Sequence, residues 1–222
     1  MGVWSMNITA RNEGLFTGTC DYTFHILGCG AIGSAAATQL ARMGGIYFHL
    51  YDRDIVEDVN IGVSQYSESD IGVNKVDALK GQLLNISREL IIDTHNGDFE
   101  EFYYQNNNDI VILGFDSMTS RLDAVTTICN NPTTKPKCII DGRMGAEHYQ
   151  QYIYTKPSLV EYKKHWYTDE EGDEEPCNAK ATSYCSNMSG SFIANSVRKF
   201  ITDAPLNGNF SFHFPTMILQ KL

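Results

Sequence analysis

A glycine-rich loop is the first segment whose residue types and spacing could do chemistry. It spans Gly28–Gly33 (Gly-Cys-Gly-Ala-Ile-Gly) and follows the apolar run Tyr22–Leu27. Its first glycine permits a tight turn, its second lets a phosphate approach the backbone, and its third allows close helix–strand packing. The free amides and the dipole of the following helix favour an anion. We therefore expect an adenine nucleotide, either NAD or ATP, at Gly28, Gly30, Ala31, Ile32 and Gly33.

A carboxylate stands where a nucleotide ribose would need it. Asp52 ends the next apolar run, Ile46–Tyr51, about 20 residues after the glycine loop. An acid at this place in a β-α-β unit hydrogen-bonds a ribose hydroxyl. The alternative is a glycine turn without a ligand, and the strand, the helix and the downstream acid together argue against it.

The elements that must position these residues alternate regularly between strand and helix. This order is typical of an α/β fold with a Rossmann-like, mostly parallel sheet and helices on both faces. The predicted strands are Tyr22–Leu27, Ile46–Tyr51, Glu89–Asp93, Asp109–Leu113 and Lys137–Asp141. The predicted helices are Ala31–Met43, Asn74–Ile86, Asp98–Gln105 and Met118–Cys129.

The pattern changes in the last third of the chain. His148–Thr155 alternates polar and apolar residues, which indicates an antiparallel strand with one exposed face. Asp169–Glu175 is an acidic loop, Ser189–Ile201 has helical spacing, and Phe210–Phe214 alternates as a strand. We expect one domain over residues 1–222 with a mixed or antiparallel C-terminal extension.

Composition excludes several classes of protein. The chain has 222 residues and a net charge of −10, so we expect no nucleic-acid partner. No apolar run reaches the roughly 18 residues of a membrane span, and the start lacks the pattern of a signal peptide. Six cysteines without a CxxC pair indicate free thiols in the cytoplasm and no zinc ribbon.

Further acidic, basic and amide residues follow the first β-α-β unit in a specific order. The segments are D-R-D-I-V-E-D-V-N at Asp52–Asn60, then Gln65, D-I-G-V-N-K at Asp70–Lys75, and G-F-D-S at Gly114–Ser117 followed by Arg121. From Phe24 to Ile201 the sequence resembles the ThiF/MoeB/ubiquitin-activating-enzyme superfamily. That family has D-x-D-x-V-E-x-x-N-L-x-R-Q, then D-x-G-x-x-K, then D-[NS]-x-x-x-R.

The resemblance implies an enzyme that adenylates the C-terminal carboxylate of a ubiquitin-like protein, or of a peptide, with a free C-terminal glycine. It also implies ATP and Mg²⁺ as cofactors and a homodimer. Because two anions must meet, cations have to screen the site. The implied roles are the ribose for Asp52, phosphate contact for Lys75, magnesium for Asp116, orientation of phosphate or metal ligands for Asn60, and nucleotide contact for Asp54 and Gln65. The structural alternatives are a solvated helix lysine for Lys75 and a helix N-cap for Asp116.

The sequence departs from the family pattern at one arginine. Asn60–Gln65 carries no arginine and one extra residue, where the family arginine neutralises the triphosphate. We expect Arg143 or Arg11 to supply this charge, with Arg53 as a further candidate. Two other functions stay open. One is a non-catalytic, partner-binding subunit of the same family, and the other is an NAD-dependent Rossmann oxidoreductase.

A cysteine that accepts the activated acyl group is the second question. Cys185 precedes the predicted helix, whose N-terminus would lower its thiol pKa, and the alternative is a buried structural cysteine. Cys177 is the exposed candidate. By position, residues 160–186 match the crossover loop that covers the partner's tail in this family, and we call them the crossover segment. Its aromatic residues Tyr162, Trp166 and Tyr167 contact the tail or belong to the core.

Overall fold

One sheet of eight strands organises the chain. The computed structural model describes residues 8–12, 14–15, 19–102, 108–132, 134–171 and 181–222. The strand order is β3-β2-β1-β4-β5-β6-β7-β8, parallel from β3 to β5 and antiparallel from β5 to β8. This confirms the predicted α/β class. The strands are β1 Thr23–Leu27, β2 Tyr47–Asp52, β3 Ile91–Asn96, β4 Asp109–Leu113, β5 Cys138–Gly145, β6 His148–Tyr154, β7 Phe210–His213 and β8 Ile218–Lys221.

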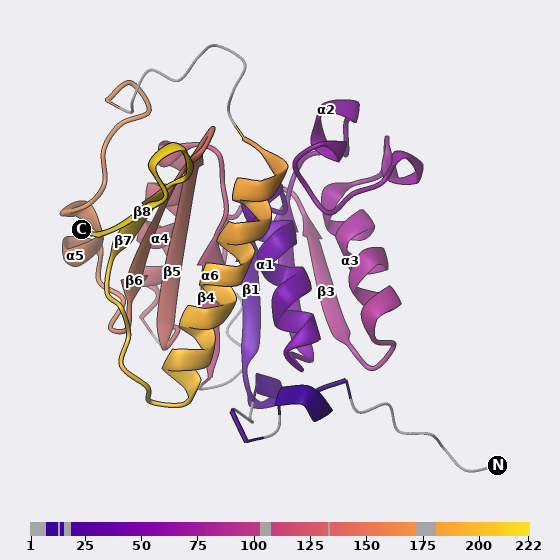
Figure 1. Cartoon of the computed structure of the whole chain (residues 1–222), viewed down its shortest axis with the longest axis horizontal. Coiled ribbons are helices and arrows are strands. Elements are labelled where there is room, and N and C mark those ends of the chain that lie inside the picture. The colour runs from indigo at the N-terminus through magenta and orange to yellow at the C-terminus, as the bar shows by residue number, and fades with distance from the viewer. Residues whose placement is uncertain (1–7, 13, 16–18, 103–107, 133, 172–180) are drawn as a thin grey trace.

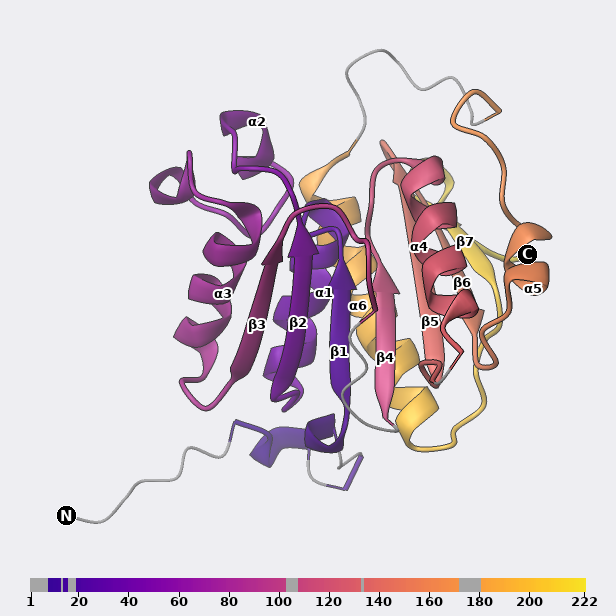
Figure 2. The same cartoon turned by 180° about the vertical axis from the view of Figure 1, so that it is seen from behind.

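Helices cover both faces of this sheet. Helices α1, α3 and α6 lie on the face seen in Figure 1, and α4 covers β4 and β5 on the face seen in Figure 2. Two separate apolar clusters fill the two faces. The helices are α1 Ala31–Arg42, α2 Asp58–Ile61, α3 Lys75–Ile86, α4 Met118–Asn130, α5 Leu159–Lys163 and α6 Ser183–Ile201, with 3₁₀ turns η1 Ala10–Asn12, η2 Thr19–Asp21, η3 Glu68–Asp70 and η4 Phe214–Thr216.

The helix predicted at Asp98–Gln105 is wrong for its described part. Residues 98–102 are not helical, and 103–105 lie outside the described residues. The reason is packing over β1 and β2, on the part of this face of the sheet that no described helix covers (Figure 2). The ring of Phe99 meets Tyr51 at 5.1 Å, and that of Phe102 meets His25 at 4.7 Å, centroid to centroid. Burying both rings on β1 and β2 outweighs the local preference for a helix.

The prediction of an exposed face on β6 is also wrong. Tyr149 and Gln151 are buried on one side of the strand, and Tyr152 and Tyr154 are buried on the other. Strand β6 is paired along both edges and covered on both faces, so its alternation of residue types does not mark a solvent-exposed side. The alternation arises because tyrosine and glutamine count as polar residues even where they are buried. The hydroxyl of Tyr149 donates a hydrogen bond to Oε1 of Gln151 at 2.9 Å, which satisfies these buried groups.

Helix α6 begins six residues earlier than the predicted Ser189, and it packs against α1. A side-chain carbon at Gly190 would lie 2.7 Å from the carbonyl carbon of Ala35, so only glycine permits this approach. Ser186 Oγ donates to the carbonyl oxygen of Ala31 at 2.8 Å.

Strand β8, at the edge of the sheet, was not predicted from the sequence. Within the described residues, no helix combines the length and the apolar character needed to cross a membrane.

Candidate functional site

The three glycines of the loop differ in what a side chain at each position would contact. Gly28 has φ +88°, and a Cβ there would lie 2.7 Å from the carbonyl carbon of Gly114. A Cβ at Gly33 would lie 1.8 Å from the carbonyl oxygen of Gly28. At Gly30, by contrast, a Cβ would meet none of the described atoms within 4 Å. The loop is therefore closed against β4 on one side and open at Gly30, which leaves room for a phosphate.

The site lies where the order of the parallel strands reverses. Strands β1 and β4 are neighbours in the sheet but are followed by connections to opposite sides, and open α/β sheets bind ligands in the resulting crevice. Figures 1 and 2 show that α1 begins next to the carboxyl end of β1. The start of α1 presents its backbone amides at the same place, which favours an anion.

Asp52 connects the end of β2 to the glycine loop. Its Oδ2 accepts the backbone N–H of Cys29 at 2.7 Å, and its Oδ1 accepts that of Asp54 at 2.9 Å. Burial raises the pKa of the Asp52 carboxyl, while these two hydrogen bonds and the charge of Lys75 act in the opposite direction. The carboxylate is thus held in a defined position beside the loop.

Lys75 is a fixed cation at the start of α3. Its Nζ donates to Oδ2 of Asp54 at 2.7 Å, and only 12% of its side chain is exposed. Burial lowers the pKa of Lys75, but the hydrogen bond to Asp54 and the charges of Asp52, Asp54 and Asp116 outweigh it, so the pKa is raised. The solvated-lysine alternative is therefore wrong, because this ammonium is largely enclosed and paired.

Asp116 and Arg121 have separate tasks after β4. Asp116 is exposed, and Ser117 is the N-cap of α4, its Oγ accepting the N–H of Ser120 at 3.2 Å. The alternative in which Asp116 caps the helix is wrong. Arg121 is buried and donates to Asp141 and to the carbonyl oxygen of Phe115. It thereby fixes the backbone next to Asp116.

Asn60 and Gln65 are tied into the local structure. Asn60 Oδ1 accepts the N–H of Glu57 at 2.9 Å and completes the capping box of α2. Gln65 Nε2 donates to Oδ1 of Asn187 on α6 at 2.9 Å. Their contact with a nucleotide stays a prediction.

Tyr66 holds the backbone of the glycine loop, a role that the sequence did not predict. Its hydroxyl donates to the carbonyl oxygen of Cys29 at 2.6 Å. Burial raises its pKa, so it remains a neutral donor. Its place directly after Gln65 was the only signal in the sequence.

Two of the arginines expected to replace the missing family arginine, Arg143 and Arg53, bind other residues of the chain. Arg143 is buried, donates to Oδ2 of Asp141 at 2.7 Å and to the carbonyl oxygen of His165 at 2.7 Å, and lies 4.3 Å above the ring of Tyr152. The reason is the buried Asp141 carboxylate, which requires a partner. Arg53 pairs with Asp98 at 2.9 Å. The expectation that Arg143 faces the nucleotide is therefore corrected.

Arg11 does not reach this site within its own chain. It lies in η1, below the sheet in Figure 1, whereas the glycine loop is at the opposite end.

The sequence left two alternatives for Cys185, an activated thiol and a buried structural cysteine. Because α6 begins at Ser183, the residue lies inside its first turn and is fully buried with Tyr149 and Phe210. Burial, with a contribution from the charge of Glu147, raises its thiol pKa to about 12. The structural alternative is favoured. Cys177 lies outside the described residues.

The aromatic residues of the crossover segment contact β5, α4 and the side chain of Arg143. Tyr162 is buried, and its hydroxyl donates to Oδ2 of Asp141 at 3.1 Å, so it belongs to the core. Trp166 Nε1 donates to the carbonyl oxygen of Met118 at 2.8 Å. The ring of Tyr167 lies 5.2 Å from the guanidinium of Arg143.

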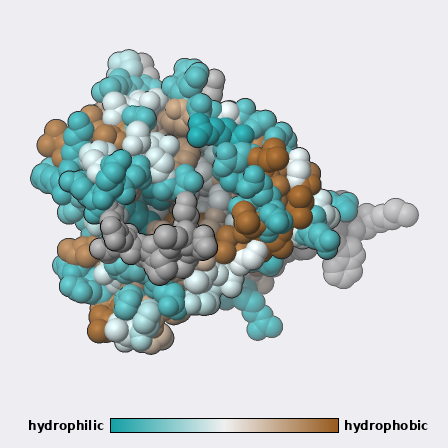
Figure 3. All heavy atoms as spheres, turned by 90° about the horizontal axis from the view of Figure 1, so that it is seen from above, coloured by the Kyte–Doolittle hydropathy of each residue, from teal (hydrophilic) through white to brown (hydrophobic). Residues whose placement is uncertain are grey.

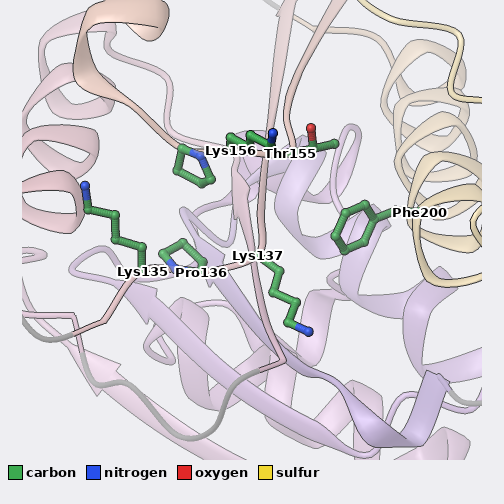
Figure 4. Close-up of a pocket in the computed structure, with 7 residues that line it drawn as sticks. Lys135, Pro136, Lys137, Thr155, Lys156 and Phe200 are labelled. Carbon is green, nitrogen blue, oxygen red and sulfur yellow. The ribbon is translucent and has the colours of Figure 1, made fainter.

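A hollow of about 440 Å³ lies away from this site. It is formed where β5 begins, β6 ends and α6 ends (Figure 4). In Figure 4 the side chains of Lys135 and Lys137 point in different directions, so their ammonium groups do not converge on one ligand. Its lining residues are Lys135, Pro136, Lys137, Thr155, Lys156, Pro157 and Phe200.

Comparison with known proteins decides the family. The model of the ThiF family matches residues 20–222, which is most of the chain. The chain belongs to the ThiF family. Curated relatives include ubiquitin-like modifier-activating enzyme 5 of Mus musculus, 30% identical over 124 residues, and of Caenorhabditis briggsae, 29% identical over 124 residues. These matches cover about half of this ThiF-family chain and 28–30% of the relatives' length.

Solved structures share the fold of this ThiF-family chain. Escherichia coli MccB with ATP has a TM-score of 0.70 and 18% identity, covering 91% of this chain and 63% of that one. MccB with succinimide has a TM-score of 0.75 and 18% identity, covering 98% and 72%. PaaA has a TM-score of 0.66 and 22% identity, covering 90% and 62%.

Proposed function

We propose that this protein adenylates the C-terminal carboxylate of a ubiquitin-like protein or of a peptide, using ATP. The observation that carries the proposal is the hydrogen bond between Asp52 and the Cys29 amide, which holds the acid proposed to bind the ribose beside an open glycine loop. Supporting it, relatives are named as ubiquitin-like modifier-activating enzymes, and MccB is described in complex with MccA and with ATP.

Each residue then has a defined task in binding and orienting the nucleotide. The amides of the glycine loop and of α1 would hold phosphates, and Asp52 would hold the ribose. Lys75 would neutralise phosphate charge, since its ammonium is held in place by Asp54. The partner's carboxylate oxygen would bond to the α-phosphorus while the bond to pyrophosphate breaks.

Mg²⁺ fits Asp116, an exposed carboxylate that, unlike Asp54, is not paired with Lys75. The ion commonly uses one or two protein carboxylates and completes its shell with phosphate oxygens and water. The charge of Asp116 also acts on Lys75, so both groups face the same region. When bound, magnesium would neutralise the phosphates and the leaving pyrophosphate.

Exchange of labelled pyrophosphate into ATP tests the proposal. We expect exchange that requires Mg²⁺ and a partner with a free C-terminal glycine, and that a partner with an amidated C-terminus does not support. Lys75→Met and Asp116→Ala should each reduce the rate by about 100-fold, the usual scale for a charged group that stabilises a phosphoryl-transfer transition state. Binding of ATP without exchange for any of the partners tested would contradict catalysis.

One observation favours a second candidate, a non-catalytic subunit that binds a partner. Residues 60–65 lack the family arginine, and the buried arginines Arg121 and Arg143 both pair with Asp141. Such a subunit would bind Mg-ATP or the partner in calorimetry and show no exchange.

We also propose a homodimer, supported by an apolar patch beside the site. Seen from above, apolar side chains gather on one side of the molecule, over α2 and the loop that leads into α3 (Figure 3). Light scattering should report two chains per particle, and Val59→Glu should shift it toward one. The exposed residues of this region are Ile55, Val59, Ile71 and Val73, each 40–68% exposed.

A further inference from the structure

The crossover segment returns to the start of α4 and binds it. Trp166 Nε1 donates to the carbonyl oxygen of Met118 at 2.8 Å. Asp169 Oδ1 accepts the backbone N–H of Met118 at 2.7 Å. The hydroxyls of Ser117 and Thr119 donate to Asp169 Oδ2, each at 3.4 Å. One helix turn is therefore held by two side chains that lie about fifty positions later in the sequence.

The carboxylate of Asp169 suits this place for two physical reasons. The first N–H groups of a helix have no partner within the helix, and Asp169 satisfies that of Met118 while Ser117 satisfies that of Ser120. The positive end of the dipole of α4, a helix of 13 residues, also stabilises a negative charge there. A carboxylate is a better acceptor at this position than a neutral side chain.

A third contact fixes the same stretch from the sheet side. Arg143 Nη1 donates to the carbonyl oxygen of His165 at 2.7 Å, and Asp141 holds the guanidinium in turn. The backbone at His165 is thereby anchored to β5 immediately before Trp166.

We propose that Trp166 and Asp169 form a latch that fastens the crossover segment to the start of α4 and so positions the loop bearing Asp116. Asp116 directly precedes the N-cap Ser117, whose hydroxyl contacts Asp169. Asp169 is a positioning residue. The consequence for Mg-ATP rests on the proposed function, whereas the latch itself rests only on these contacts.

The tryptophan content of the chain provides a direct test of the latch. The chain has two tryptophans, Trp4 and Trp166, so Trp4→Phe leaves Trp166 as the reporter. In this background Asp169→Ala should shift the emission to longer wavelength and raise the acrylamide quenching constant at least twofold. Asp169→Asn keeps an acceptor and should give a smaller change. The neighbouring exposed acid provides the control, and Glu170→Ala should change neither quantity.

The absence of any fluorescence change in Asp169→Ala would overturn the latch. Circular dichroism and the melting temperature establish that each variant is folded. If Asp169→Ala does not fold, Asp169→Asn with its intermediate quenching decides the question.

A second measurement separates positioning from a merely structural contact. By calorimetry, Asp169→Ala should bind Mg-ATP several-fold more weakly and bind ATP in EDTA unchanged, because only the magnesium complex uses Asp116. Opening of the latch with unchanged affinity for Mg-ATP would overturn the positioning role. If the unmodified chain binds no ATP, the proposed function fails, and the fluorescence comparison still decides the latch.

Discussion

The carboxylate of Asp52 lies 2.7 Å from the backbone nitrogen of Cys29 and accepts its N–H. Strands β1 and β2 are parallel neighbours, so their carboxyl ends lie side by side and the two loops that follow can meet. The bond links the residue predicted to bind the ribose with the loop predicted to bind phosphates. It makes the two parts of the site one rigid unit.

Removing this carboxylate should weaken nucleotide binding. Loss of hydrogen bonds to a charged group costs about 1.5–3 kcal/mol, so Asp52→Ala should bind Mg-ATP about 10- to 100-fold more weakly in calorimetry. Asp52→Asn should lose less, since an amide oxygen still accepts from Cys29. Asp123→Ala, on the exposed side of α4, is the control, and equal affinity of Asp52→Ala and Asp123→Ala would contradict the assignment.

Two glycines of the same loop should respond differently to alanine. Gly33→Ala places a carbon 1.8 Å from the carbonyl oxygen of Gly28, so the backbone must move, and we expect about 1–3 kcal/mol lower stability in urea unfolding.

Gly30→Ala should unfold like the original chain and yet lose most of its affinity for Mg-ATP, because its new methyl group occupies the open space. An equal loss of stability in both variants would show that the loop is uniformly packed.

A stack of histidines should make the fold sensitive to acid. His25 and His49 stack at 4.8 Å, and His49 Nδ1 lies 3.1 Å from His95 Nε2. Burial lowers the pKa of all three, that of His49 to about 4, with further lowering by the charge of His25. The folded state thus binds fewer protons than the unfolded state below pH about 6.5.

Stability should therefore be constant above pH about 7 and should fall between about pH 6.5 and 4. For His49 alone we expect a loss of about 1–3 kcal/mol across this range, and His49→Gln should reduce the fall in urea midpoints measured at pH 7.5 and 5. His213→Gln, at an exposed position on β7, is the control. A pH dependence unaltered by His49→Gln would exclude this histidine as its source.

Arg143 should prove structural. Arg143→Ala removes the contacts to Asp141 and His165, but Asp141 keeps Arg121, so we expect a loss of about 2 kcal/mol, less than for a fully broken buried pair. Its affinity for Mg-ATP should stay within about twofold of the unmodified chain, a difference under 0.5 kcal/mol. Weakened ATP binding at unchanged stability would return Arg143 to the nucleotide site.

The thiol of Cys185 should resist alkylation. Burial raises its pKa to about 12, so it is a neutral thiol at pH 7.5, and the thiolate is the nucleophile. Mass spectrometry after native iodoacetamide treatment should show Cys20, which is exposed, modified at least tenfold faster. Comparable rates would indicate that the first turn of α6 opens readily.

Much of the nucleotide side of this protein was predictable from local sequence. The glycine loop, Asp52 and the surrounding β-α-β unit depend on neighbouring residues and on strand ends that the parallel order brings together. Gly28 and Gly33 meet local demands of the backbone, a positive φ at Gly28 and a close approach of Gly33 to the carbonyl oxygen of Gly28.

Only the tertiary structure decided which charges face solvent and which face each other. In the sequence, Arg143 is a candidate for binding the nucleotide, but in the structure it pairs with the buried carboxylate of Asp141. Helix α6 begins earlier than predicted, and Cys185 lies buried in its first turn. Asp169 belongs to an acidic run in the sequence, yet its carboxylate accepts the N–H of Met118 at the start of α4. The sequence alone determines the residue types and their local backbone, whereas burial and pairing depend on contacts between distant segments, which exist only once the sheet has formed.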